Sequence, residues 1–295
     1  MYPLIIVGMH RSGTSLVSRK LRDAGVFMGA NLSGGHSESQ CFLAINKRIF
    51  ALAHASWDNP QPVDWMMRDA ALLDGVIDTL RSEFDLDQFH DHFFGEHSVG
   101  QSAGDAAVAG QPGHDPRNAQ STSWGWKDPR TSYTLSLWLR LFPGAKVVHV
   151  VRHGVDVAAS LVTREQRRKF RFDSPARSVR CLDYDRAFEL WEQYVQQCQR
   201  SCATLDSHQQ LTLTYEDLLT IPGASLHRLL EFANTPEDVT TRLSTVDELA
   251  QDIDASRHMA HRNNAELNEM ATQKLRTSAM LRHYYGAASA ASIAA

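Results

Sequence analysis

The first hydrophobic segment of the chain is short and apolar throughout, and a glycine-framed loop follows it directly. Residues 3–7 are PLIIV, residues 8–13 are GMHRSG, and residues 14–25 carry apolar positions at helical spacing and end at Gly25. This pattern predicts a buried strand over 3–7, a tight loop, and a helix over 14–25.

Two later segments also predict strands. AKVVHVVR at residues 145–152 contains a continuous apolar stretch and is followed by a helical pattern, and LTLTYEDLL at residues 211–219 predicts a strand that passes directly into a helix. Strands that are apolar throughout and alternate with helices are typical of a parallel sheet covered on both faces. We therefore predict an α/β fold in three layers, with ligands bound beyond the carboxyl ends of the strands.

The remaining pattern is mainly helical. Ser37 and Gln40 form a capping box that predicts a helix running to about residue 55, and helical spacing recurs over 63–84, 131–142 and 175–205. Residues 95–123 are rich in Gly, Ala, Ser and Gln, which predicts a flexible insertion, and residues 287–295 predict a disordered tail. We expect a single domain over residues 1–286.

Composition narrows the function classes. The chain has 295 residues, 14 histidines and a net charge of −4, so it is not a general polyanion or nucleic-acid binder, and an anionic ligand requires a local basic cluster. The apolar run Leu4 to Val7 is far too short to span a membrane, and it lacks the basic segment and the cleavage site that are typical of a signal peptide. Four cysteines without framework spacing are typical of free thiols, so we expect a cytoplasmic protein.

The loop after the first strand has the chemistry of an anion cradle. Gly8 and Gly13 let backbone N–H groups turn inward at a helix N-terminus, Thr14 and Ser15 add hydroxyl donors, and Arg11 adds a guanidinium suited to phosphate. The alternative is an ordinary strand-to-helix turn with a solvated arginine.

The loop differs from that of nucleoside triphosphatases. Their signature places a lysine at the position of Thr14, and they normally use an acidic residue at a strand end to hold magnesium. Here the second strand ends in Arg152. The arrangement therefore requires no magnesium.

Four motifs together resemble sulfotransferases that use 3′-phosphoadenosine-5′-phosphosulfate (PAPS), a family with a P-loop-like fold. The loop Arg11-Ser12-Gly13-Thr14 resembles the family's 5′-phosphosulfate loop, and GWKDPRT contains Lys127 in the Lys-Asp-Pro motif of the tyrosylprotein and several bacterial branches. VVRHGVDVAASL resembles the 3′-phosphate motif, and TYEDLL resembles an adenine-side segment. The chain is most similar to the bacterial and Golgi-type branches. The glycine-rich C-terminal nucleotide motif of cytosolic sulfotransferases is not recognisable here, so the resemblance assigns no contact beyond residue 220.

The resemblance implies a role for each matching residue. It implies donor-binding roles for the residues at these motifs, namely Arg11, Ser12, Gly13, Thr14, Ser15, Arg152, Ser160, Arg164 and Tyr215. It implies catalytic roles for Arg11 and Lys127 in stabilising charge and for Glu38 as the base. Alternative bases are His36, His10 and His153. Alternatively, Lys127 pairs with Asp128 at a strand edge, and Glu38 stabilises the first turn of the Ser37-capped helix.

The predicted reaction is in-line transfer of the sulfuryl group from PAPS to a hydroxyl of a small molecule, lipid or carbohydrate, which releases adenosine 3′,5′-bisphosphate (PAP). No metal is expected, although FHDHFFGEH at residues 89–97 is rich in possible ligands. The alternatives are a P-loop kinase or other nucleoside-triphosphate-binding protein, and a non-catalytic nucleotide-binding module. The sequence does not identify the acceptor or the oligomeric state.

Overall fold

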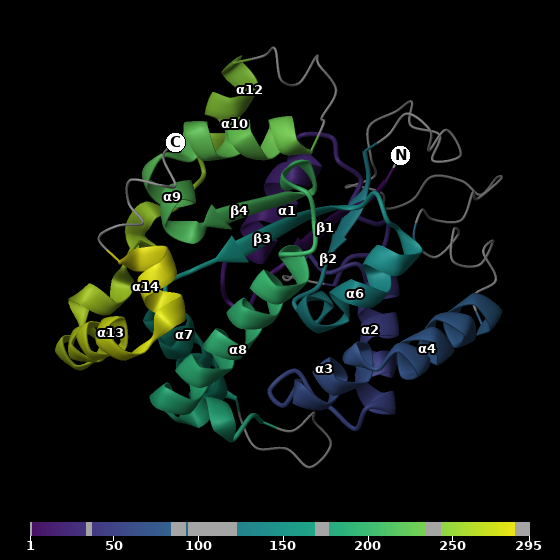
Figure 1. Ribbon diagram of the computed structural model, residues 1–295. Coiled ribbons are helices and arrows are strands. Elements are labelled where there is room, and N and C mark those ends of the chain that lie inside the picture. The colour runs from purple at the N-terminus through teal and green to yellow at the C-terminus, as the bar shows by residue number, and fades with distance from the viewer. Residues whose placement is uncertain are drawn as a thin grey trace, which may run out of the picture.

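A four-stranded parallel sheet forms the centre of the computed structural model, which describes residues 2–33, 37–83, 93, 123–168, 177–233 and 243–286 (Figure 1). The strand order is β2-β1-β3-β4, so the chain crosses from one side of β1 to the other after β2. Leu4 lies opposite Gly125 on one side and Lys146 on the other. The strands are β1 (Leu4–Val7), β2 (Gly125–Lys127), β3 (Lys146–Val151) and β4 (Gln210–Thr214).

Helices cover both faces of this sheet, which confirms the predicted three-layer α/β fold. Alternate residues of β1 point to opposite faces, so that Ile5 and Val7 belong to one buried cluster while Leu4 and Ile6 belong to another. Figure 1 shows α10 and α12 above the sheet and α8 below it. The first cluster includes side chains of α2 (Gln40–Leu52), α6 (Thr131–Leu141), α7 (Gly154–Arg167) and α8 (Tyr184–Cys202). The second includes side chains of α1 (Thr14–Asp23), α10 (Pro222–Phe232) and α12 (Leu243–Ala250).

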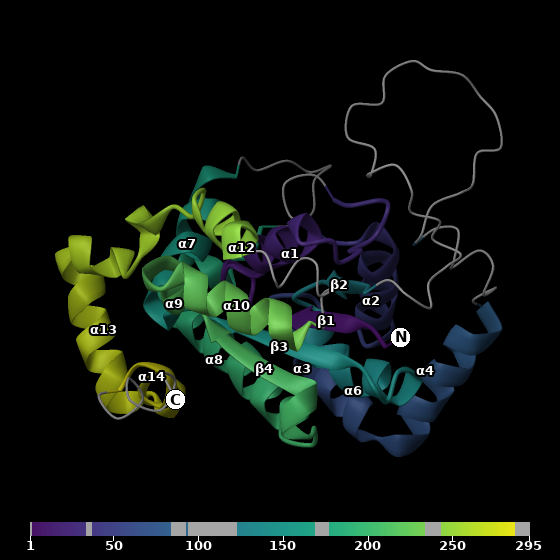
Figure 2. The same ribbon diagram turned by 90° about the horizontal axis from the view of Figure 1, so that it is seen from above.

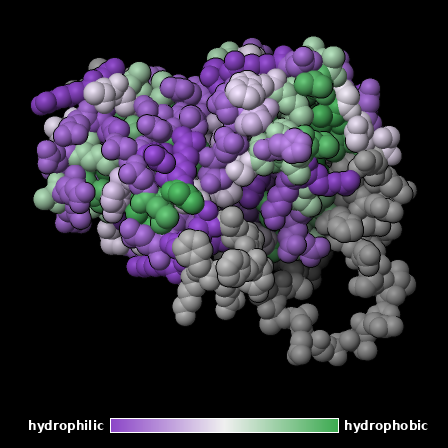
Figure 3. Space-filling view, turned by 90° about the horizontal axis from the view of Figure 1, so that it is seen from below, coloured by the Kyte–Doolittle hydropathy of each residue, from purple (hydrophilic) through white to green (hydrophobic). Residues whose placement is uncertain are grey.

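The other helices lie around this core. Figure 2 shows α13 and α14 together at one side of the molecule, next to the end of the described chain. On the face seen from below, hydrophilic side chains cover most of the described surface and hydrophobic ones form separate patches (Figure 3). The other α-helices of the described residues are α3 (Gln61–Arg68), α4 (Ala70–Glu83), α9 (Tyr215–Thr220), α13 (Ala265–Thr277) and α14 (Ala279–Tyr285).

Three helix predictions need correction. Ser37 does not cap α2, because its φ is 54° and the helix begins at Gln40, with Ser39 at the N-cap. The stretch 63–84 is not one helix, because Asp69 is extended between α3 and α4. The predicted helix over 175–205 begins only at Tyr184, where the Asp183 side chain accepts a hydrogen bond from the N–H of Arg186.

The strand β2 was not predicted. It contains only the three residues Gly-Trp-Lys, which is too short for a hydrophobic period to be visible in the sequence. Its pairing beside β1 places Lys127 at the carboxyl edge of the sheet.

Several predictions concern residues outside the described part of the chain: the insertion over 95–122, the tail over 287–295, His36, and all of 89–97 except Phe93. Within the described residues, no helix combines the length and the apolar character needed to cross a bilayer. All four cysteines are free, and three of them are buried.

Candidate active site

The carboxyl ends of the central strands open into one cleft with a volume of about 550 Å³. Nine of the predicted site residues line it: Arg11, Gly13, Thr14, Ser15, Glu38, Lys127, Arg152, Arg164 and Tyr215. The other two predicted residues are not among the lining residues. Ser12 is fully buried, and Ser160 accepts a hydrogen bond of 2.8 Å from Nε of Arg11.

Both loop glycines lie too close to a neighbouring residue to carry a side chain. Gly8 has a φ of 141°, and a Cβ there would lie 2.4 Å from the carbonyl oxygen of Val150 in β3. Gly13 has a φ of 90°, and its Cβ would lie 2.3 Å from the ring of Tyr215. Arg11 also has a positive φ of 72°, a conformation that non-glycine residues rarely adopt. The loop is therefore held in one shape by β3 and Tyr215.

Three motifs that are far apart in the sequence meet at Arg152. One of its NH groups donates to the carbonyl oxygen of Arg11 at 3.4 Å, and its guanidinium carbon lies 4.6 Å from the centre of the Tyr215 ring. Burial lowers the pKa of Arg11, and the nearby guanidinium groups of Arg164, Arg152 and Arg257 lower it further. Such a crowded group of cations favours a bound anion.

The same cleft also contains an ion pair between Lys127 and Glu38. The Lys127 Nζ lies 3.2 Å from Oε1 of Glu38, and both side chains are largely buried. Glu38 is fixed by its backbone, since its N–H donates to the Ser33 hydroxyl at 3.2 Å and its carbonyl accepts from the Ser33 N–H at 2.7 Å. Burial lowers the pKa of Lys127, and the neighbouring Glu38 carboxylate opposes that shift.

This geometry contradicts the two alternative roles considered for these residues. Glu38 lies before Gln40, where α2 starts, so it is not in the first turn of the helix. The ion pair of Lys127 is made with Glu38, whereas Asp128 is held by other groups. Asp128 accepts from the backbone N–H of Arg130 at 3.0 Å, from its guanidinium at 3.2 Å, and from the Asn46 amide at 2.9 Å.

The possible histidine bases differ in position. His10 lines the cleft beside Arg11. His153 is buried, and its ring stacks on that of His261 at 4.2 Å between centroids. Burial lowers the pKa of His153 to about 3, and nearby His261 contributes to the shift. His153 therefore has neither the position nor the basicity for proton abstraction in this cleft.

His153, Asp156 and His261 form a buried group in which three potential metal ligands lie close together. Their arrangement does not suit a metal ion, because the two imidazole rings are stacked with planes only 20° from parallel, whereas the ligands of one ion surround it tetrahedrally. Instead, Asp156 accepts a hydrogen bond of 2.7 Å from the backbone N–H of His261. The group therefore anchors the C-terminal segment to α7.

Several lining residues were not found from the sequence. Arg257 approaches the cleft from the 3-10 turn Ala255–Arg257, and its carbonyl accepts a hydrogen bond of 3.4 Å from Arg152. Arg257 lies in an irregular segment, where no periodic pattern or motif marks it. The other lining residues that the sequence did not single out are Leu16, Arg19, Lys47, Pro129 and Arg130. Trp57, which the sequence allows as a core residue or as a wall of the acceptor pocket, lines the cleft 4.5 Å from the guanidinium carbon of Arg164.

Comparison with known proteins shows the family of the chain. The model of the sulfotransferase family matches residues 3–239, a span that includes all eleven predicted site residues. The chain belongs to the sulfotransferase family. It is a sulfotransferase enzyme, and Arg257 lies beyond the matched span.

Solved structures support the fold of this sulfotransferase. The chain resembles the sulfotransferase domain of the Synechococcus PCC 7002 olefin synthase, with 17% identity, 93% of each chain covered and a TM-score of 0.51. It also resembles the sulfotransferase domain of the curacin biosynthetic pathway, with 18% identity, 92% of this chain and 96% of that chain covered, and a TM-score of 0.50. A sulfotransferase of Mycobacterium tuberculosis matches with 14% identity, 85% of this chain and 77% of that chain covered, and a TM-score of 0.51. No curated protein sequence matched the chain.

Proposed function

We propose that this sulfotransferase transfers the sulfuryl group of PAPS to an acceptor hydroxyl on a small molecule, lipid or carbohydrate. The observation that carries the proposal is the Lys127–Glu38 ion pair in the same cleft as the Arg11 loop and the Arg152–Tyr215 contact. The cleft thus combines groups for an anionic nucleotide with a base and an electrophile for the transfer.

The donor is expected to lie with its 5′-phosphosulfate at the loop. Gly13, Thr14 and Ser15 line the cleft at the N-terminus of α1, where backbone N–H groups attract anions, and Arg11 adds a guanidinium. A positive charge and hydrogen-bond donors at this point would stabilise the leaving phosphate in the transition state.

The nucleotide end of the donor would lie toward Arg152. Arg152, Arg164 and the Ser160 hydroxyl are assigned to the 3′-phosphate, and Tyr215 to the adenine side. The close approach of Arg152 and Arg11 supports this assignment, because one ligand with two anionic ends can contact both. We also assign Arg257 to the 3′-phosphate, because its carbonyl accepts a hydrogen bond from Arg152.

The transfer itself needs a proton acceptor and a stabilised leaving group. Glu38 takes the proton of the acceptor hydroxyl, whose oxygen then forms a bond to sulfur while the bond from sulfur to the bridging phosphate oxygen breaks. Lys127 donates a hydrogen bond to that departing oxygen, which it can do beside Glu38 because an ammonium has three donors. PAP leaves with the bridging oxygen, and the sulfated acceptor carries the sulfuryl group. The His10 imidazole is the remaining alternative base in the cleft.

The alternative functions make different demands on the same residues. A P-loop kinase would need a cation in place of Thr14 and an acid at the end of β3, where this chain has Arg152. A non-catalytic nucleotide-binding module would not need a buried lysine paired with a glutamate at the cleft. The four free cysteines support a reducing compartment, for which we propose the cytoplasm.

The donor assignment is tested by calorimetric titration of the wild-type protein with PAP and, separately, with magnesium-ATP. We expect saturable PAP binding that does not require magnesium, weaker binding of ATP, and loss of PAP affinity in Arg11→Ala. Binding of magnesium-ATP without binding of PAP would overturn the proposal in favour of a kinase or triphosphatase.

A further inference from the structure

We propose that the acceptor of this sulfotransferase is itself an anion, whose negative group is held by Lys47 and Arg130 while its hydroxyl faces Glu38. This inference rests on the proposed function and extends it to the class of acceptor. It follows from the number of cations in the cleft and from their separation into two groups.

The cleft contains more positive charge than the donor can neutralise. Nine of its lining residues are lysine or arginine, and Glu38 is the single acidic one. Two further carboxylates pair with these cations from outside the lining: Asp128 with Arg130, and Glu165 with Arg164 and Arg168. Nine cations against three carboxylates leave six positive charges, whereas PAPS carries roughly four negative ones, about two of them on its 3′-phosphate.

One group of cations lies on the donor side. Arg152 contacts the backbone of both Arg11 and Arg257, and Arg164 is near enough to Arg11 to lower its pKa. This group surrounds the loop and Tyr215. It accounts for the anionic ends of the nucleotide.

Lys47 and Arg130 form a second group beyond the Lys127–Glu38 pair. The two are linked through Asn46, the residue before Lys47, whose amide donates to Asp128 at 2.9 Å and to the Thr131 hydroxyl at 2.9 Å. Asp128 in turn holds Arg130. These hydrogen bonds join the middle of α2 to the segment after β2. Lys47 and Arg130 line the cleft from these two joined segments.

The position of Lys47 suits an acceptor contact. It lies seven residues beyond Gln40, where α2 begins, and so about 10 Å along the helix from the end that carries Glu38. The side chain of Lys47 is exposed and makes no hydrogen bond or ion pair with the described part of the chain. An acceptor with its hydroxyl at Glu38 and its anionic group several ångströms away could therefore contact both residues. The flexible side chain of Lys47 shortens the distance between its ammonium group and Glu38.

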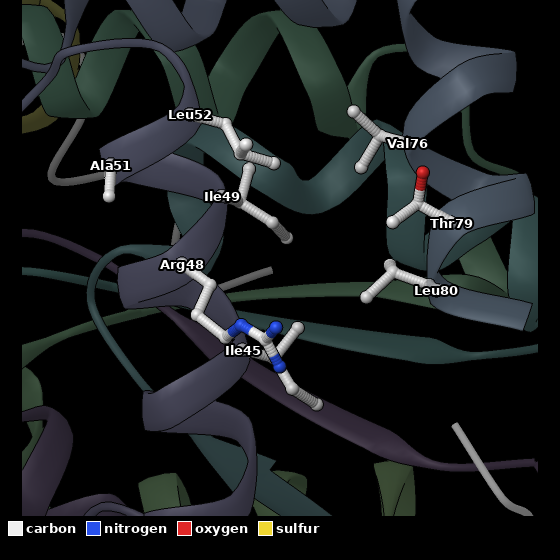
Figure 4. A pocket seen from close by; sticks show the side chains of 8 residues that line it. All are labelled: Ile45, Arg48, Ile49, Ala51, Leu52, Val76, Thr79 and Leu80. Carbon is white, nitrogen blue, oxygen red and sulfur yellow. The ribbon is translucent and has the colours of Figure 1, made fainter. Parts of the chain in front are cut away.

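The next residue of α2 provides a matched control. Arg48 lines a different groove, formed by apolar side chains of α2 and α4 such as Ile45, Ile49 and Leu80 (Figure 4). Substitution of Arg48 removes the same charge from the same turn of the same helix. It does so outside the cleft that holds Lys127 and Glu38.

The experiment compares two probes on protein saturated with PAP, so that the donor anion sites are already filled. The probes are 3-(4-hydroxyphenyl)propionate and its neutral methyl ester, titrated into wild type, Lys47→Gln, Arg130→Gln and Arg48→Gln. We expect the carboxylate to bind about tenfold more tightly than the ester, which is the effect of one charge-assisted hydrogen bond. That preference should disappear in Lys47→Gln, decrease in Arg130→Gln and persist in Arg48→Gln.

Three results would overturn the inference: an ester that binds as tightly as the carboxylate, a preference that survives in Lys47→Gln, or a carboxylate without saturable binding. The PAP titration that precedes each measurement separates this failure from that of the donor assignment. If PAP itself does not bind, the proposed function fails, and the inference about the acceptor fails with it.

Discussion

The Nζ of Lys127 lies 3.2 Å from Oε1 of Glu38, although 89 positions separate the two residues in the chain. One residue ends the short edge strand β2, and the other lies in the irregular segment before α2. Their contact places the electrophile and the base of the proposed transfer at one point. The ion pair is therefore the feature on which the following predictions concerning catalysis depend.

Removing the carboxylate of Glu38 should reduce turnover while leaving donor binding intact. We expect Glu38→Gln to lower kcat by roughly 10²- to 10⁴-fold, the usual contribution of a positioned base, with the Kd for PAP changed less than about threefold. Steady-state kinetics and calorimetry on the same preparation measure both quantities. Near-normal kcat in Glu38→Gln, with a large loss in His10→Gln, would instead identify His10 as the base.

The pH dependence of activity should report the protonation of Lys127. Its burial lowers its pKa, and only the protonated ammonium can donate to the leaving oxygen. Activity should therefore fall as the pH rises through this lowered pKa, below the range in which an exposed lysine titrates. In Lys127→Arg the guanidinium stays protonated, so kcat/KM for PAPS should be lower overall but should lose this alkaline decrease. The same alkaline decrease in both proteins would exclude Lys127 as its source.

The loop depends on the absence of a side chain at Gly13. Gly13→Ala places a methyl group against the Tyr215 ring, whereas Gly25, which also has a positive φ of 91°, has nothing within 4 Å of its Cβ position. Gly25→Ala should cost about 1 kcal/mol of unfolding free energy from backbone strain alone. Gly13→Ala should cost more and should also weaken PAP binding, which Gly25→Ala should leave unchanged. Denaturant unfolding and PAP titration of the two variants test this difference.

Buried histidines should make the fold sensitive to mild acid. Burial lowers the pKa of His149 and of His153 to about 3, well below the ordinary value of about 6.5. As the pH falls below 6.5, the unfolded chain binds protons that the folded chain does not, so the folded state loses stability. Between pH 7.5 and 5.5 each such histidine should cost about 1.4 kcal/mol.

Unfolding by urea at these two pH values measures the loss. His149→Phe keeps an aromatic ring beside Tyr284, and it should lose less stability on acidification than the wild type. His208→Gln changes an exposed histidine and should match the wild type. Equal losses in His149→Phe and the wild type would show that His149 does not contribute to this acid sensitivity.

The sequence allowed the donor loop and the sheet to be predicted because both depend on contiguous residues. The run from Leu4 to Thr14 contains its own strand, turn and helix start, and Arg152 follows directly on an apolar strand. The identity of the lysine's partner could not be derived in this way. Glu38 is held beside Lys127 by two hydrogen bonds between its backbone and Ser33, which no periodic pattern predicts.

The cleft residues that the sequence did not reveal were missed for the same reason, because no periodic pattern marks their segments. Arg257 lies in a 3-10 turn that is held by backbone hydrogen bonds, and β2 is too short to show a period. The helix boundary before α2 was misplaced because Ser37 and Gln40 have the spacing of a capping box, while the backbone at Ser37 has a positive φ and Ser39 takes the N-cap. Local sequence motifs were therefore enough to locate the site, whereas tertiary contacts determine which other residues line it.

The central claim is that the cleft recognises a nucleotide with a 3′-phosphate, and Arg152 tests it most directly. The measurement is a calorimetric cycle with PAP and AMP, which differ only in that phosphate, on wild type and Arg152→Ala. The account predicts that PAP binds far more tightly than AMP to the wild type. It also predicts that Arg152→Ala weakens PAP by at least about tenfold and AMP by much less, because a charge-assisted contact is lost only for PAP. Equal affinity of the wild type for the two nucleotides, or an equal loss for both in Arg152→Ala, would contradict the account.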